Sequence, residues 1–211
     1  MRIEQFVDRI TEKELIPSIN LTRPKYVQPE DRILYRSHRI LIILALLNTK
    51  NGISKDVIAC VDFLLRNSGY QKKFILEYFK GKTNILKKLN YFTDKNTVEI
   101  DFNIVQYRSV PWDLRFNDMF LFLYVRSLIQ ISSNNKDKNI RIHLTETGQT
   151  YTEKVKEVFA SEINFLELFN SSVQEAKAID IITNIIPQTY WRENEKLNNK
   201  KLFIKVPFTS C

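Results

Sequence analysis

The chain has 211 residues, of which 44% are hydrophobic and 27% are charged, and its formal net charge is +8. Only 4 Gly and 6 Pro occur, which disfavours a turn-rich β architecture and favours helices. The longest apolar run, Ile40 to Leu47, is far shorter than the roughly 20 residues needed to span a bilayer. The N-terminus lacks the hydrophobic region of a signal peptide, so we expect a cytoplasmic protein with no membrane association.

The first half of the chain is expected to be helical. Residues 1–30 predict a short helix and then an irregular arm, because three prolines interrupt helical geometry there. A long helix is predicted from Asp31 through the apolar run, whose apolar character on nearly all faces indicates central burial. Ser54 is expected to cap the next helix, which carries one apolar stripe from Val57 to Leu65.

Shorter elements follow. Amphipathic spacing predicts helices over 74–79 and 85–92, and alternating hydrophobic residues predict a strand over 98–105. Trp112, which comes after Pro111, is expected to be a loop residue folded onto the core.

The segment from Asp118 to Thr145 is the most informative about the fold. A strongly apolar helix is predicted from Asp118 through Ile129, followed by a polar turn over 132–139 and a half-buried strand over 140–144. Thr145 is placed to cap another helix. This order is typical of winged-helix proteins, so we expect a mainly α fold with small β-wings (α+β), made of winged-helix modules and helical extensions.

The last part of the chain predicts two more helices, the second of which ends at Pro187, and then an apolar arm. We therefore divide the chain into an N-terminal helix and arm (1–30), a helical, winged-helix-like half (31–110), a second winged-helix half (111–170), and a C-terminal helix with a docking arm (171–211).

Signals of catalysis are scarce. The chain has no phosphate-binding loop, no G-x-G-x-x-G loop and no G-x-S-x-G elbow. His38 and His143 lie in no ligand motif, and Cys60 and Cys211 form no CxxC pair. We therefore expect no enzyme activity, cofactor, metal or small-molecule substrate.

Two weak carboxylate patterns do not change this expectation. Glu175 and Lys177 have E-x-K spacing, but neighbours two apart on a helix point in different directions. Glu99 and Asp101 share the polar face of the predicted strand, where a solvated surface is the commoner interpretation.

Two sets of residues are candidates for binding. A lysine cluster is able to contact phosphate or an acidic protein, although a solvated lysine-rich surface is the commoner interpretation. The cluster comprises Lys72, Lys73, Lys80, Lys82, Lys87 and Lys88. The C-terminal part offers partner-docking anchors, for which ordinary packing is the alternative; these are Trp191, Phe203, Ile204 and Phe208.

Residues 32–69 contain Arg39 before the ILIILALL run and then Val61-Asp62-Phe63-Leu64, and residues 144–151 read L-T-E-T-G-x-x-Y. Together with the VFASEINFLELF stretch, these motifs resemble the middle components of bacterial three-component ABC-type systems, over about residues 30 to 170. The chain departs from that pattern in carrying GYQKKFILEYFKG where the family often has a glycine-rich stretch, and in its added C-terminal arm.

The family includes the middle component of the Lamassu anti-phage defence system. The resemblance implies a non-catalytic accessory subunit that bridges an SMC/Rad50-like ATPase and an effector, often a nuclease. Non-specific contact with DNA within the complex is compatible with this role. The alternative is a winged-helix DNA-binding transcriptional regulator. Its candidate recognition segment, Asp118 to Ile131, is dominated by Phe, Leu and Val, and we expect that face to be buried.

Overall fold

The computed structural model describes residues 32–47, 51–81, 104–133, 140–172 and 174–192. Within these ranges the chain is mainly helical with a small antiparallel sheet, as the sequence predicts. The predicted helix over 85–92, the segment 1–30, most of the strand predicted over 98–105 and the C-terminal arm beyond residue 192 lie outside the described residues. None of the described helices is both long and apolar enough to cross a membrane.

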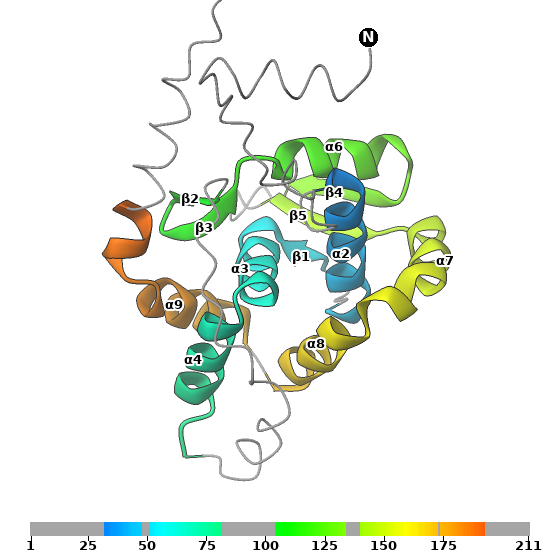
Figure 1. The fold of residues 1–211 in the computed structure, drawn as a ribbon. Coiled ribbons are helices and arrows are strands. Elements are labelled where there is room, and N and C mark those ends of the chain that lie inside the picture. The colour runs from blue at the N-terminus through cyan, green and yellow to red at the C-terminus, as the bar shows by residue number, and fades with distance from the viewer. Residues whose placement is uncertain (1–31, 48–50, 82–103, 134–139, 173, 193–211) are drawn as a thin grey trace, which may run out of the picture.

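Two helices form the centre of the fold (Figure 1). Helix α2 (Ile33–Leu46) is buried from Arg36 to Leu44 apart from His38, which confirms the central burial predicted from its apolar run. Helix α3 (Lys55–Arg66) packs beside it and begins at Ser54, whose side chain accepts a hydrogen bond from the Asp56 N–H at 3.2 Å, as predicted.

Two pairs of helices flank this central pair on two sides (Figure 1). Helices α4 (Ser68–Tyr78) and α9 (Glu175–Ile185) pack together beside α3. Helices α7 (Glu146–Val155) and α8 (Ala160–Ser172), joined by a 3-10 turn (Lys156–Phe159), pack against α2. Apolar residues of all four helices belong to one hydrophobic core or pack against it.

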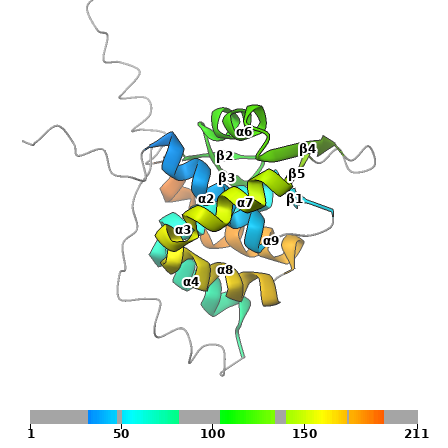
Figure 2. The ribbon, with the colours of Figure 1, turned by 90° about the vertical axis from the view of Figure 1, so that its right-hand side faces the viewer.

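A three-stranded antiparallel sheet has the order β1–β5–β4 (Figure 2). Strand β1 (Ile53–Ser54) precedes α3, whereas β4 (Ile129–Ser133) and β5 (Ile140–Leu144) follow α6. Ile142 pairs with Ile53 on one side and with Ile131 on the other. The first and second halves of the chain therefore share one sheet.

A second hairpin was not predicted. Strand β2 (Ile104–Tyr107) pairs with β3 (Val110–Asp113), so Trp112 belongs to a strand and not to a loop, although it is packed onto the core as expected. Arg108 and Ser109 form the turn, both at positive φ (49° and 71°). Hairpin turns of this kind usually carry Asn-Gly or Asp-Gly, and the absence of that signal explains why the sequence did not reveal it.

Helix α6 (Phe116–Val125) ends earlier than predicted, because Ile129 already belongs to β4. Ser127 adopts φ 57°, the Ser127 N–H donates to the Tyr124 carbonyl (2.9 Å), and the Leu128 N–H donates to the Leu123 carbonyl (3.0 Å). These are the two hydrogen bonds of a Schellman helix end, a position usually taken by glycine. Because serine occupies this position, the sequence contains no glycine that would predict the end of the helix here.

The L-T-E-T-G motif forms the corner between the sheet and α7. Thr145 Oγ1 accepts from the Gly148 N–H at 2.9 Å, which confirms the predicted cap, and it lies 2.7 Å from the Ser127 carbonyl oxygen. A Cβ atom at Gly148 would lie 2.1 Å from the Leu128 carbonyl oxygen. Glycine is therefore required for α7 to approach the end of α6 so closely.

Candidate functional site

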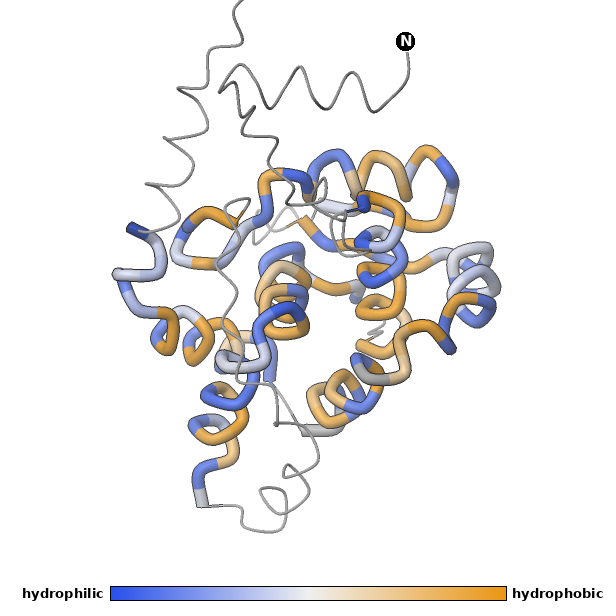
Figure 3. Tube along the Cα trace, in the orientation of Figure 1, coloured by the Kyte–Doolittle hydropathy of each residue, from blue (hydrophilic) through white to orange (hydrophobic). Residues whose placement is uncertain are grey.

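Helix α6 is apolar on its exposed side as well as on its buried side. Phe116, Met119, Phe120 and Leu123 are buried against the protein. The solvent side nevertheless carries Leu121, Tyr124 and Val125, which are 60%, 52% and 71% exposed. The expectation that the apolar face of this segment is buried is wrong for these three residues, because α6 packs on α2 and β4 with only one face. Figure 3 shows hydrophobic residues along much of α6 although this helix lies at the periphery.

A groove separates α6 from one face of the sheet, and we call it the α6 groove. Its volume is about 210 Å³, below the range of about 300–1,000 Å³ that is usual for small-molecule sites. The residues that line it are Lys55, Trp112, Asn117, Phe120, Leu121, Tyr124, Ile131, Ile140 and Ile142. A concave apolar surface of this size suits side chains of a partner protein.

The register of β4 and β5 determines which side chains form the sheet side of the α6 groove. Ile131 of β4 lies opposite Ile142 of β5, so both side chains are on the same face of the sheet. Ile131 is 44% exposed and Ile140 is 38% exposed. Both belong to the same hollow as Leu121 and Tyr124, so the exposed apolar residues of α6 and of the sheet form one surface.

Lys55 is the one charged residue among those that line the α6 groove. Its Nζ atom lies 5.2 Å from the ring centroid of Trp112 and 5.5 Å from that of Tyr107, within the range of cation–π attraction. Among the described residues, Lys55 forms no ion pair with a carboxylate. The groove thus combines apolar walls with a cation held over an aromatic wall.

A buried ion cluster holds the β2–β3 hairpin, and with it Trp112, against the helices. Asp62 of α3 is 2% exposed and accepts from Arg39 Nε at 2.7 Å and from Arg36 Nη2 at 3.0 Å. Burial alone would raise the pKa of Asp62, but the two guanidinium groups outweigh it and hold the pKa below its ordinary value. Asp62 is therefore a charged group that joins α2 to α3.

The second carboxylate of the cluster is Asp113, at the end of β3. It accepts from Arg36, from Arg66 Nη1 at 3.1 Å and from the Arg115 N–H at 2.8 Å. Burial would raise the pKa of Asp113, and Arg36 and the hydrogen bonds from Arg115 lower it below its ordinary value. Arg36 bridges both aspartates, so one network fixes the hairpin next to the α6 groove.

Sequence motifs do not predict this cluster. Arg39 and Asp62 belong to the motifs that carry the family resemblance, and Arg36, Arg66 and Asp113 belong to no motif of the sequence analysis. Their pairing joins positions 26 and 77 residues apart, so no local spacing encodes it.

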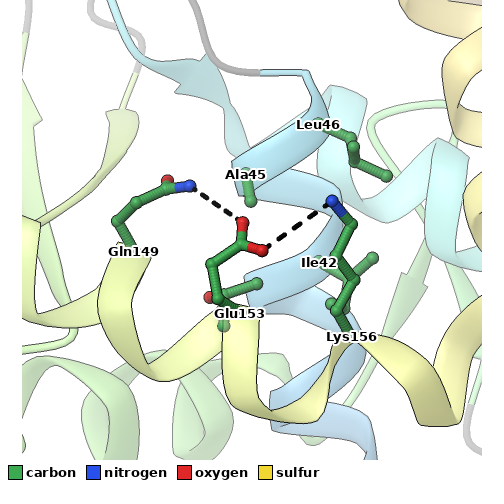
Figure 4. A pocket seen from close by; sticks show the side chains of 7 residues that line it. Ile42, Ala45, Leu46, Gln149, Glu153 and Lys156 are labelled. Atoms are coloured by element: carbon green, nitrogen blue, oxygen red, sulfur yellow. Dashed lines mark hydrogen bonds and ion pairs between the residues drawn. The ribbon is translucent and has the colours of Figure 1, made fainter.

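A second hollow, of about 200 Å³, lies between α2 and α7 (Figure 4). Ile42, Ala45 and Leu46 line it from α2. Glu153 of α7 lies between Gln149 (3.4 Å) and Lys156 (3.9 Å), and these exposed contacts along one helix contribute little. The Thr152 hydroxyl, which also lines the hollow, donates to the Gly148 carbonyl at 2.7 Å, so the polar side chains of this hollow already have partners within α7 and the turn that follows it.

The lysines of the predicted cluster lie away from the α6 groove where the structure describes them. Lys72 and Lys73 are on α4 and Lys80 follows its end, whereas Lys82, Lys87 and Lys88 lie outside the described residues. Helices α4 and α6 are at opposite ends of the molecule in both ribbon views (Figure 1, Figure 2).

The apolar anchors are only partly described. Trp191 is buried, and its ring lies 5.1 Å from that of Tyr190. Phe203, Ile204 and Phe208 lie outside the described residues, so docking by the C-terminal arm stays a prediction.

The isolated titratable residues have ordinary partners. His38 Nε2 lies 2.9 Å from the Tyr151 hydroxyl, and burial lowers the pKa of His38. His143 Nε2 lies 2.8 Å from Ser132 Oγ. Glu175 faces Arg141 at 3.8 Å and Lys177 lies over a tyrosine ring, so the two point to different neighbours, as predicted.

Glu99 and Asp101 lie outside the described residues. Within the part of the chain that the structure describes, no three His, Cys, Asp or Glu side chains gather as a metal site would require. Comparisons of this chain with protein families, with curated proteins and with solved structures found no match.

Proposed function

We propose that this chain is a protein-docking subunit whose main binding surface is the α6 groove. The observation that carries the proposal is the exposure of Leu121, Tyr124 and Val125 beside an apolar hollow. Contiguous exposed apolar surface on a folded protein marks an interaction site, because burying it on a partner is favourable.

We further propose that the central elements form a winged-helix module. The support is their order: α2, β1 and α3, then, after α4 and the β2–β3 hairpin, α6, β4 and β5, with the sheet order β1–β5–β4. In such a module α6 takes the place of the recognition helix. Leu, Tyr and Val at its exposed positions suit a protein partner better than base edges.

The resemblance of the sequence to middle components of three-component ABC-type systems specifies the partners in this proposal. The chain is then a non-catalytic accessory subunit of an anti-phage defence complex, and it docks an SMC/Rad50-like ATPase and couples it to an effector. A bridging subunit needs at least one persistent apolar interface, which the α6 groove is suited to supply.

The test is co-purification after the chain is expressed together with its neighbouring genes. The tagged wild-type chain should retain an ATPase of the SMC type. Leu121→Asp should reduce the retained ATPase at least tenfold, which corresponds to about 1.4 kcal/mol, because it places a charge in a desolvated interface.

Leu76→Asp is the matched control. Leu76 is 51% exposed on α4, at the other end of the molecule, so this variant should retain the partner. The melting temperatures of both variants should equal that of the wild-type chain, which shows that both fold normally. A solitary monomer from native cells, or equal loss of the partner in both variants, would contradict the proposal.

A further inference from the structure

We infer that the α6 groove receives an amphipathic helix of the partner, which inserts one large apolar side chain into the hollow and sets a carboxylate against Lys55. The inference rests on the proposed docking function and adds the chemistry of what is docked. Three properties of the groove support it: its volume, the elements that form its walls, and the charge of its lining.

The size of the groove fits an anchor side chain. Its volume of about 210 Å³ is too small for most cofactors. Aromatic side chains (Trp, Phe and Tyr) and aliphatic side chains (Leu and Ile) make up most of its lining. Apolar anchors that fill such hollows dominate the energetics of many interfaces. A Leu or Phe side chain is therefore the expected occupant of the hollow.

The walls of the groove favour a helix over an added strand. One wall is α6, and the other is the sheet face that carries Ile131 and Ile142. A strand would join the sheet through backbone hydrogen bonds at the edge of β4, and its side chains would not fill this face. A helix laid beside α6 packs its side-chain ridges directly into the hollow.

The charge of the groove selects an acidic partner. Lys55 is the only charged residue in the lining, and among the described residues it makes ring contacts but no ion pair. Arg108 Cζ lies 5.4 Å from the centroid of the same Tyr107 ring that Lys55 contacts, so a second cation adjoins this ring. A Glu or Asp one helical turn from the apolar anchor reaches Lys55 while the anchor is in the hollow.

The experiment measures binding of two labelled synthetic peptides to the full-length chain by fluorescence anisotropy. Both are helical peptides of about 20 residues with one leucine stripe, long enough to hold helical structure. The residues beside the stripe are Glu in one peptide and Lys in the other. The acidic peptide should bind the wild-type chain at least about fivefold more tightly than the basic one, and added salt should reduce that preference.

Two variants locate the effect. Lys55→Met keeps an unbranched apolar stem over Trp112 but removes the charge, so it should reduce the preference to less than about twofold while leucine-dependent binding persists. Lys72→Met, on α4, is the matched control and should leave the preference unchanged. Leu121→Ser should weaken both peptides.

The outcomes separate this inference from the proposed function. Equal binding of both peptides, or a preference that survives Lys55→Met, would overturn the acidic-helix inference while leaving docking at α6 intact. Absence of binding by either peptide, with Leu121→Asp still disrupting co-purification, would overturn it too. If neither peptide binds and Leu121→Asp also leaves co-purification unchanged, the proposed function itself is overturned.

Discussion

At the scale of single residues, the buried ion cluster is the most consequential feature. Arg36, Asp62 and Asp113 are at most 2% exposed. Transferring such charges out of water costs several kcal/mol each, about as much as their mutual attraction returns, so the intact network adds little net stability. Removing one member is different, because it leaves the opposite charge buried without a partner. The cluster therefore specifies how the hairpin docks more than it stabilises the fold.

Asp62→Asn should lower the free energy of unfolding by about 3–5 kcal/mol, because Arg36 and Arg39 lose their shared carboxylate inside the protein. Urea denaturation at pH 7 measures the change. Glu153→Gln is the control, since this exposed carboxylate pairs only loosely with Lys156 at 3.9 Å and should shift stability by no more than about 0.5 kcal/mol. Equal effects of the two substitutions would contradict the assigned role.

The same prediction has a pH signature. The pKa values of Asp62 and Asp113 are lower in the folded protein than in the unfolded chain. The stability that the folded protein gains from ionising these two carboxylates is therefore fully present above the unfolded-state pKa of about 3.9. It is lost as the pH falls toward the lower pKa values of the folded state. Urea midpoints should drop below about pH 4 in the wild type, and the drop should be smaller in Asp62→Asn.

At the scale of elements, the corner between α6, β4 and α7 determines the shape of the groove. The Schellman end at Ser127 turns the chain from α6 into β4, and Thr145 binds the same turn while it caps α7. This corner sets the angle between α6 and the sheet, and hence the width of the α6 groove.

Thr145→Ala should cost about 0.5–2 kcal/mol, because the Gly148 N–H loses its acceptor and the corner loses its side-chain link to Ser127. Thermal or urea denaturation gives the size of the effect. Thr147→Ala, at an exposed position of the same helix, is the matched control and should change stability by at most about 0.5 kcal/mol. A loss no greater than that of the control would show that the cap is not needed.

At the scale of the whole molecule, the two candidate binding features point to different partners. The described lysines of the predicted cluster belong to α4 and its end, whereas the apolar surface belongs to α6 at the opposite end (Figure 2). A DNA-binding regulator of the winged-helix type would place its main lysine cluster around the recognition helix. The distance of the described lysines of this cluster from α6 supports the proposal of protein docking at α6, and it leaves α4 for non-specific contact with phosphates or for solvent.

Duplex binding as a function of salt tests that division. Any affinity at low salt should fall steeply as salt rises and should not depend on sequence. Replacing Lys72 and Lys73 by Gln should weaken it, whereas Leu121→Ser should leave it unchanged. Sequence-selective binding that Leu121→Ser abolishes would instead support the regulator.

The sequence alone predicted those elements whose positions depend on residues close together in the chain. The burial of α2, the caps at Ser54 and Thr145, the strand over 140–144 and the end of α9 before Pro187 follow from apolar spacing and capping chemistry. These features depend on residues a few positions apart, so one sequence is able to specify them.

Tertiary structure alone decided the rest. The Arg108-Ser109 turn and the Ser127 helix end use positive φ without glycine or asparagine, so they carry no local signal. Which apolar residues of α6 stay exposed depends on how much of its surface α2 and β4 cover. The ion cluster and the α6 groove each join segments far apart in the chain, and only the packing of the folded chain brings them together.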